Sequence, residues 1–400
     1  MSLSKPDNYM PTYDFPEEIL SEIFKRLPVK YVLRCRAVQK SWYHLLKTPM
    51  FITLHCNYQK LTAHVNPKYL LFHNNNTHLL TVCSDDKQCQ QYCTLEYPFD
   101  FYGHEWSALS NGLVCVSSVL YRRNGYDSNI YLWNPIVQKC RTLPNSPLSR
   151  YTYEEIEWMA LAFGFLPEVN DYVVVHVARL GPELPDPSDP DPPDPYEYDP
   201  EVMICVYSLN TNSWKYFYLD GVIIGCISSD QSVFVSGTAF WVAFDFAGSY
   251  QLIMYWDTKT NTLGEINVPV LVRDQDRQFD DPLIQQFGES IAYFVEDNDS
   301  HQLDIWVLKD DPIKEFYWEK KMSVSLGENV WADVLGIRNN GEPILAKLNN
   351  LISYDLHTHE PYDFIDLCDR LTPNSNHEEG FLPPFFITPF VETLLWFDID

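Results

Sequence analysis

A repeating pattern of about 50 residues constrains the fold of this chain more than any other feature. From about residue 67 onward, short β-branched and aromatic runs alternate with Asn, Asp, Gly and Pro, which is typical of strands and turns. Five runs share one arrangement of strand, polar turn and returning strand, with markers at Tyr131, Tyr207, Tyr255, Trp306 and Tyr354. The steps between these markers are 76, 48, 51 and 48 residues. A step near 50 residues is the length of a four-stranded propeller blade.

The pattern therefore predicts a mainly β chain in which residues 67–400 form a β-propeller of about six blades. Tyr69-Leu-Leu-Phe supplies an earlier candidate strand, 60 residues before Tyr131. A closed ring leaves no open sheet edges, which suits a chain with so many strands. The blades are kelch-like in length, although the double-glycine and paired Tyr/Trp signatures of kelch repeats are missing. A twisted two-sheet β-sandwich is the alternative.

The long first step contains an insertion from Gly181 to Glu201. This stretch holds eight prolines, eight acidic residues and no Lys or Arg. Its composition excludes helix and central strand and predicts an extended, solvated loop. One interpretation is a tolerated surface insertion, since long loops are accommodated at low cost. The other is a contact loop for a basic substrate protein, formed by Asp186, Asp189, Asp191 and Asp194.

The N-terminal part of the chain has a different periodicity and predicts a small α domain over residues 14–56, after a mobile polar tail at 1–13. Apolar residues between positions 15 and 27 recur at helical spacing, with Asp14 as N-cap, Pro16 in the first turn and Pro28 as the stop. Further helices are expected over residues 29–34 and 37–46, and a short connecting helix over 50–56. So small a unit is marginal unless it docks on something, so its surplus apolar residues suggest a partner surface.

Three runs in this unit resemble an F-box: Phe15-Pro-Glu-Glu-Ile-Leu, Ile23-Phe-Lys-Arg-Leu-Pro-Val-Lys and Leu33-Arg-Cys-Arg-Ala-Val-Gln-Lys-Ser-Trp. Many positions match in order and without a gap. Two depart from the usual pattern, because Phe15 stands where Leu is usual and Gln39 where Cys is common. The alternative is an ordinary N-terminal helical subdomain packed on the rest of the chain.

The β body carries a second resemblance, so that the two together cover nearly the whole chain. Runs such as Ser110-Asn-Gly-Leu-Val-Cys, Trp133-Asn-Pro, Phe163-Gly-Phe and Val206-Tyr-Ser-Leu-Asn-Thr-Asn-Ser-Trp resemble the F-box-associated domain of plant F-box proteins. The run Phe390-Val-Glu-Thr-Leu-Leu-Trp is similar to the ending seen in the S-locus F-box group and its relatives.

These resemblances imply a non-catalytic substrate receptor of an SCF-type E3 ubiquitin ligase. The F-box would bind the Skp-type adaptor, and through it cullin and a RING protein, while the β body would hold a target protein. Trp42 is expected either at this adaptor surface or in the packing of the F-box itself. The expected adaptor-binding residues are Pro16, Ile19, Leu20, Ile23, Leu27, Pro28, Leu33, Val38 and Trp42.

The target implied by the S-locus resemblance is a basic, secreted-type ribonuclease (an S-RNase) taken up by pollen tubes in self-incompatibility. Charge agrees with this expectation, since residues 1–60 hold nine Lys/Arg and five Asp/Glu, whereas the other 340 hold 19 and 50. The same imbalance disfavours nucleic acid, because phosphate must be met by Lys and Arg. The alternatives are another plant target, such as an immune regulator, and a free-standing propeller scaffold without a ligase role.

The sequence offers no catalytic constellation, cofactor motif or paired metal-binding motif. There is no Gly-rich phosphate loop and no Gly-x-Ser-x-Gly elbow, and Cys83, Cys89 and Cys93 lack a paired CxxC. Ten scattered cysteines, most of them in apolar stretches, favour a reducing compartment, cytoplasmic or also nuclear. No run of 18 apolar residues and no signal-peptide core occurs, so no membrane contact is expected.

Overall fold

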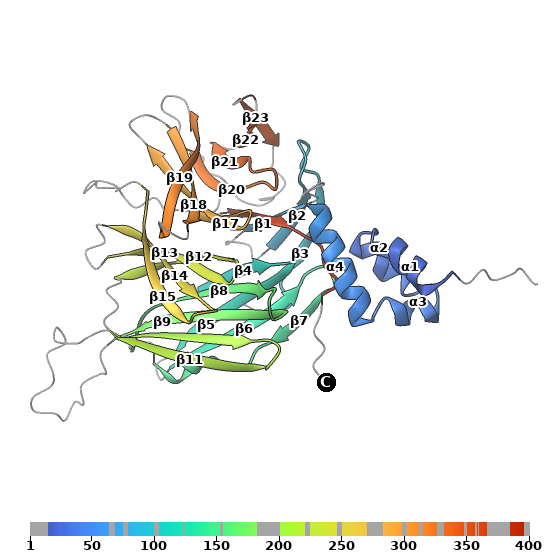
Figure 1. The fold of residues 1–400 in the computed structure, drawn as a ribbon, viewed down its shortest axis with the longest axis horizontal. Coiled ribbons are helices and arrows are strands. Elements are labelled where there is room, and N and C mark those ends of the chain that lie inside the picture. Colours follow the sequence, from blue (N-terminus) through green and yellow to red (C-terminus); the bar gives the residue numbers. More distant parts are fainter. Residues whose placement is uncertain are drawn as a thin grey trace, which may run out of the picture.

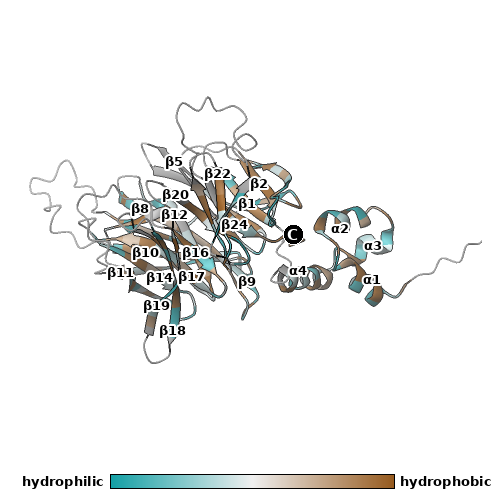
Figure 2. Ribbon diagram, turned by 90° about the horizontal axis from the view of Figure 1, so that it is seen from above, coloured by the Kyte–Doolittle hydropathy of each residue, from teal (hydrophilic) through white to brown (hydrophobic). Residues whose placement is uncertain are grey.

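The computed structural model of the chain consists of a helical unit followed by a larger β body (Figure 1). It describes residues 15–63, 69–74, 79–99, 104–122, 125–152, 155–181, 201–220, 225–245, 250–269, 283–297, 302–311, 315–325, 332–347, 350–356, 358, 360–365 and 385–395. Helices α1 to α3 lie to one side of the strands, and α4 runs beside them at the edge of the body (Figures 1 and 2). None of the described helices is long and apolar enough to cross a membrane.

Four helices form the N-terminal unit: α1 (Glu17–Phe24), α2 (Val29–Cys35), α3 (Lys40–Leu45) and α4 (Pro49–Ala63). The expected order of helices is confirmed, with corrections at their ends. Pro16 is the N-cap of α1 rather than a first-turn residue, and Asp14 lies outside the described residues. Helix α3 begins three residues later than predicted, and α4 runs on to Ala63 because its inner side packs against the first helices.

The described strands form six four-stranded antiparallel blades, which confirms the propeller expectation over the sandwich. The first three blades are β24 (Phe385–Phe390) with β1 (Tyr69–Asn74), β2 (Leu79–Ser84) and β3 (Gln91–Glu96); β4 (His104–Ser110), β5 (Leu113–Arg122), β6 (Gly125–Asn134) and β7 (Lys139–Thr142); and β8 (Ile156–Leu166), β9 (Asp171–Leu180), β10 (Glu201–Ser208) and β11 (Ser213–Asp220).

The other three blades follow in chain order. They are β12 (Cys226–Val235), β13 (Thr238–Phe244), β14 (Gln251–Asp257) and β15 (Thr262–Asn267); β16 (Ile284–Phe287), β17 (Ser290–Asp297), β18 (Gln302–Asp311) and β19 (Glu315–Ser325); and β20 (Ala332–Ile337), β21 (Pro343–Lys347), β22 (Asn350–Tyr354) and β23 (Pro361–Ile365). The first strands of successive blades lie side by side, and most of the core fills the spaces between facing blades.

All five aromatic markers of the repeat lie on the third strand of their blades, from Tyr131 on β6 to Tyr354 on β22. The step of about 50 residues is therefore the spacing between equivalent strands. Tyr69 is not equivalent to them: it lies on β1, the second strand of its blade, whose third strand is β2. The insertion also falls where it was expected, because Leu180 at the end of β9 pairs with Glu201 at the start of β10.

The ring is closed by a strand from the far end of the sequence. Strand β24 pairs antiparallel with β1, from Tyr69 opposite Phe390 to Asn74 opposite Phe385, and meets β20 in parallel at Gly336 and Ile387. The first blade is thus completed by residues more than 300 positions away in the chain. The first and last blades therefore form one continuous eight-stranded sheet.

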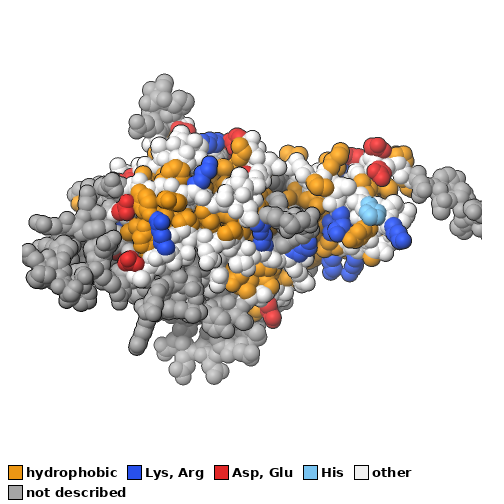
Figure 3. Space-filling model, turned by 90° about the horizontal axis from the view of Figure 1, so that it is seen from below, with side chains coloured by type: hydrophobic (Ala, Val, Ile, Leu, Met, Phe, Trp, Pro, Cys, Tyr) orange, Lys and Arg blue, Asp and Glu red, His pale blue; other side chains and the backbone are white. Residues whose placement is uncertain are grey.

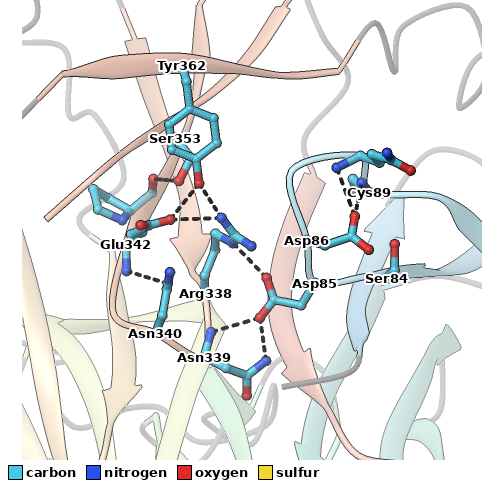
Figure 4. A network of polar contacts seen from close by, with 12 residues as sticks. Ser84, Asp85, Asp86, Cys89, Arg338, Asn339, Asn340, Glu342, Ser353 and Tyr362 are labelled. Carbon is cyan, nitrogen blue, oxygen red and sulfur yellow. Dashed lines mark hydrogen bonds and ion pairs between the residues drawn. The ribbon is translucent and has the colours of Figure 1, made fainter. Parts of the chain in front are cut away.

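A buried polar network holds the same two blades together (Figure 4). Arg338, which follows β20, places Nε 2.6 Å from Asp85 Oδ1 and Nη1 2.8 Å from Glu342 Oε2. Tyr362 on β23 donates to Glu342, and Asn339 donates to Asp85. Burial opposes the charge of Arg338, but Asp85, Tyr362 and Glu342 together outweigh this effect, so the pKa of the guanidinium is raised. The network links the turn after β2 to the turn between β20 and β21.

Candidate functional site

The helical unit has a small apolar core, to which the body adds the buried Leu394 and the partly buried Ile136 and Val137. Trp42 of α3 packs edge-on against Phe24 of α1, with ring centroids 4.9 Å apart. His55 of α4 hydrogen-bonds the Leu27 carbonyl oxygen at 2.9 Å and so fixes the turn after α1. The buried members of this core are Phe24, Val29, Val32, Leu46, Phe51 and Leu394.

Outside this core, α1 keeps an apolar stripe in solvent. Ile19 and Ile23 are four residues apart and therefore share a face of α1, and Phe15 lies just before the N-cap Pro16. Their exposed fractions are 58%, 47% and 49%. A groove of about 570 Å³ beside them is lined by Glu18, Ile19, Glu22, Ile23, Arg26 and Leu27. An exposed apolar stripe with a charged rim is typical of a protein docking surface. We call Phe15, Ile19 and Ile23 the α1 stripe.

The nine residues predicted to contact an adaptor divide into two groups. Four are exposed: Pro16, Ile19, Ile23 and Val38. Five are half-buried: Leu20, Leu27, Pro28, Leu33 and Trp42. All of the half-buried group except Pro28 pack against the core of the helical unit, which is one of the two alternatives given for Trp42. Their contact with an adaptor stays a prediction, and the structure separates outward-facing residues from those that support them.

Sequence reasoning missed several exposed apolar side chains of this unit. Phe15 could have been found, because it continues the four-residue spacing of Ile19 and Ile23. Tyr31, Tyr43 and Met50 gave no such signal, since their exposure depends on how α2, α3 and α4 pack. The four aspartates predicted to bind a substrate (Asp186, Asp189, Asp191 and Asp194) lie outside the described residues.

Residues 391–395, which follow β24, join the helical unit to the body. We call them the junction segment. The Val29 backbone N–H at the start of α2 donates to Glu392 Oε2 at 3.2 Å, and Cys56 Sγ of α4 lies 2.9 Å from Thr393 Oγ1. Leu394 fills the helical core, whereas Leu395 packs into the core between the second and third blades. Successive side chains of one segment therefore enter both parts of the molecule.

Two sequence motifs of the second blade hold the junction segment in place. Asn134 donates from Nδ2 to the carbonyl oxygens of Thr393 at 3.0 Å and Leu395 at 2.8 Å, while its Oδ1 accepts two backbone N–H groups of the following turn. Gly112 has φ +76°, and a Cβ at this position would lie 2.2 Å from the Val391 carbonyl oxygen. The Asn-Gly and Trp-Asn-Pro motifs thus act through contacts that sequence alone does not reveal.

The first blade also contacts the helical unit beside Glu392. Lys30 Nζ of α2 lies 5.7 Å from the centre of the Tyr92 ring on β3. Burial, together with the neighbouring Glu392 carboxylate, raises the pKa of Tyr92 to about 12. The phenol therefore stays neutral at physiological pH and keeps its proton for a hydrogen bond. Charge and hydrogen bonding thus supplement the apolar contact made by Leu394.

One buried pair resembles a nucleophile beside a base. His176 Nδ1 lies 3.1 Å from Ser146 Oγ, and burial lowers the pKa of His176 to about 4. Both side chains are almost wholly enclosed, with exposed fractions of 0% and 1%, so a substrate has no access to them. Ser146 instead caps the short helix η1 (Pro147–Arg150) through the Leu148 N–H. Within the described part of the chain, no group of three His, Cys, Asp or Glu side chains is arranged to hold a metal ion.

Comparison with known families and proteins follows the same division of the chain. The F-box associated beta propeller domain model matches residues 107–352, and the F-box domain model matches residues 13–54. An F-box/kelch-repeat protein of Arabidopsis thaliana is 23% identical over 267 residues, which cover 64% of this chain and 66% of the relative. The Arabidopsis thaliana F-box protein CPR1 is 23% identical over 366 residues, 85% of this chain and 82% of the relative.

Another Arabidopsis thaliana F-box protein is 28% identical over 239 residues, or 57% of this chain and 58% of the relative. Two of these three matches therefore span less than two thirds of the relative's length. Among solved structures, the beta-propeller domain of the Trilobed protease from Pyrococcus furiosus is 15% identical, with a TM-score of 0.36, over 68% of this chain and 74% of that one.

Proposed function

The chain belongs to the plant F-box proteins that carry an F-box associated beta propeller domain, and we propose that it is the substrate receptor of an SCF-type ubiquitin ligase. The α1 stripe is the observation that carries this proposal. Phe15, Ile19 and Ile23 stay in solvent while the neighbouring apolar residues pack inward. Covering three such side chains would contribute several kcal/mol at about 25 cal/mol per Å² of apolar surface.

The proposed mechanism is proximity. The F-box docks on a Skp-type adaptor, which connects to cullin and a RING protein, and the β body holds a target beside the ubiquitin-loaded conjugating enzyme. The chain raises the local concentration of a target lysine while other subunits make the bond. The junction segment supports this role, because it ties both parts of the chain together through Glu392, Thr393 and Leu394.

Co-expression with a plant Skp-type adaptor, followed by size-exclusion chromatography, tests the proposal. We expect a one-to-one complex. Ile19→Asp should abolish it, because a carboxylate at an apolar contact is costly to bury. Ile19 is preferable to Leu20 as the test site, since Leu20 packs against the helical core and its loss could unfold the unit. Separate elution of the two wild-type proteins would refute the receptor role and leave a binding scaffold.

For the target we propose a basic protein, of the S-RNase class that the S-locus resemblance implies. The support is the excess of acidic residues outside the first 60, where 50 Asp/Glu face 19 Lys/Arg. Binding of a basic ribonuclease to the adaptor complex should weaken between low and physiological salt, because exposed charges are screened over about 8 Å at 0.15 M. An affinity that does not change with salt concentration would indicate another plant target, such as an immune regulator.

We also propose a reducing compartment, the cytoplasm or the nucleus, as the site of action. The support is that none of the nine cysteines within the described residues forms a disulfide. Burial raises the pKa of several of them, among them Cys93 and Cys140, each to about 11, which keeps these thiols protonated and unreactive. Imaging of a tagged chain in plant cells would test this placement.

A further inference from the structure

A tyrosine surface is left uncovered where the second and third blades meet at their outer edge. The outer strand of the second blade, β7, has four residues, whereas the outer strand of the third, β11, has eight. Trp214 on β11 contacts the segment that follows β7, because its Nε1–H donates to the Pro144 carbonyl oxygen at 2.9 Å. Farther along the same face, Tyr216 and Tyr218 are 51% and 38% exposed. The mismatch in strand length accounts for their exposure.

Arg150, at the end of η1, lies over these rings. Its guanidinium carbon is 5.1 Å from the ring centre of Tyr151, 5.4 Å from that of Tyr216 and 5.8 Å from that of Tyr218. Nη2 donates to the hydroxyls of Tyr151 and Tyr218, and these hydroxyls lie 2.9 Å apart. We call Arg150, Tyr151, Tyr216 and Tyr218 the tyrosine shelf. Ser146 caps η1, and the hydrogen bonds to Tyr151 and Tyr218 hold the guanidinium in place.

The positive charge of Arg150 has no ion-pair partner among the described carboxylates. Several of those in the same blade are engaged elsewhere: Glu157 pairs with Arg179 at 2.8 Å, Glu168 pairs with Lys259 at 2.6 Å, and Asp171 accepts from Ser208 at 2.5 Å. Figure 3, seen from the side where β11 lies, shows hydrophobic side chains with Lys and Arg among them and acidic ones mainly at the margin.

We propose that the tyrosine shelf binds an extended acidic segment of a partner protein. A carboxylate of that segment meets the free N–H groups of Arg150, and its apolar side chains or proline rings lie on Tyr216 and Tyr218. An extended ligand fits because the two tyrosines are two residues apart on one face of a strand, so the contacts repeat along the strand. Nucleic acid does not fit, since one cation cannot neutralise a run of phosphates.

The proposal does not depend on the ligase role and is tested on the full chain. The probe is a fluorescein-labelled decapeptide of alternating Glu and Pro, which is extended in water, and fluorescence anisotropy measures its binding. The same peptide with Gln in place of Glu is the ligand control. We expect the Glu peptide to bind more tightly and Arg150→Met to weaken it about tenfold or more, because a charge-assisted hydrogen bond is lost.

A matched variant on the same strand separates a built site from general charge. Lys215→Met removes one positive charge from β11, but residue 215 faces the other side with Phe217 and Leu219, which pack toward the fourth blade. Its affinity should equal that of the wild type. Tyr216→Ala should weaken binding while leaving the hydrogen bonds of Arg150 to Tyr151 and Tyr218 in place, so it tests the shelf even if Arg150→Met is unstable.

Three results would overturn the proposal. In the first, neither the wild type nor any variant binds the Glu peptide. In the second, the Glu and Gln peptides bind equally. In the third, Arg150→Met and Lys215→Met weaken binding to the same extent, which would mean that Arg150 only fastens η1 to β11 and that the peptide responds to net charge.

Discussion

At the scale of single residues, Arg338 shows how strongly a buried charge depends on its neighbours. Its side chain is 6% exposed, and its main partner Asp85 is 1% exposed. We expect Arg338→Met to lower the free energy of unfolding by about 3–5 kcal/mol, because two buried carboxylates lose their cation. Urea unfolding followed by fluorescence measures the change.

Lys309→Met is the matched control for Arg338→Met. Lys309 Nζ lies 3.5 Å from Glu319 Oε2, but both side chains are well exposed, so water replaces the lost contact. This variant should unfold at nearly the wild-type urea concentration. Equal effects of the two substitutions would contradict the structural role of the network between the first and last blades.

His176 supplies a prediction about pH. Because burial lowers its pKa in the folded chain from 6.5 to about 4, the unfolded chain binds a proton in this range and the folded chain does not. The stability that depends on neutral His176 is complete above pH 6.5 and is lost as the pH falls toward 4. Its full size is about 3 kcal/mol, from 1.36 kcal/mol per pKa unit.

We therefore expect His176→Asn to lose less stability than the wild type between pH 6.5 and 4. Chemical unfolding at several pH values measures the free energy of unfolding of both proteins. In the difference between them, the contributions of the carboxylates that both proteins share cancel. The same substitution at His44, which is exposed on α3, is the control. Parallel stability curves for wild type and His176→Asn would contradict the assignment.

At the scale of elements, the sequence pattern predicted those strands that pair with strands nearby in the sequence. The aromatic markers found the third strand of five consecutive blades, because each lies in a hairpin that is continuous in sequence. Tyr69 is not a further member of the repeat, because its blade is completed by β24 from the other end of the chain. Pairing across 300 residues leaves no periodic signal.

At the candidate site, too, the sequence did not predict contacts between residues that are far apart in the chain. Helical spacing placed Ile19 and Ile23 on one helix face together with Leu20, since spacing along one helix is a local property. The division between exposed Ile19 and half-buried Leu20 or Trp42 required the packing of four helices and Leu394. Glu392 and Thr393 belong to the run Phe390-Val-Glu-Thr-Leu-Leu-Trp, but their contacts with α2 and α4 depend on tertiary structure.

Closure by β24 carries its own prediction. A Cβ on Gly336 would lie 2.0 Å from the Ile387 carbonyl oxygen, at the point where β20 meets β24. Gly336→Ala should therefore lower the free energy of unfolding by about 1–3 kcal/mol, as overpacking does. Hydrogen exchange should accelerate in β24 before it does in β13 or β14. Unchanged exchange in β24 would mean that this contact does not hold the ring closed.

At the scale of the whole molecule, the junction segment decides whether the helical unit and the body move as one. Leu394 is 2% exposed in the helical core, so Leu394→Ala should cost about 2–5 kcal/mol there and accelerate hydrogen exchange in α1 to α4. Leu395→Ala is the matched control, because the adjacent side chain packs within the body instead. Equal exchange of the helices in both variants would contradict a junction through Leu394.

We expect the α1 stripe to be the surface by which this chain joins a ligase. Calorimetric titration of the adaptor into purified Ile23→Asp and Leu61→Asp variants tests it most directly. Leu61 lies on α4, outside the stripe, and is also exposed, at 73%. We expect Ile23→Asp to lose measurable binding while Leu61→Asp binds as the wild type does. Wild-type affinity in Ile23→Asp, with the chain folded, would contradict it.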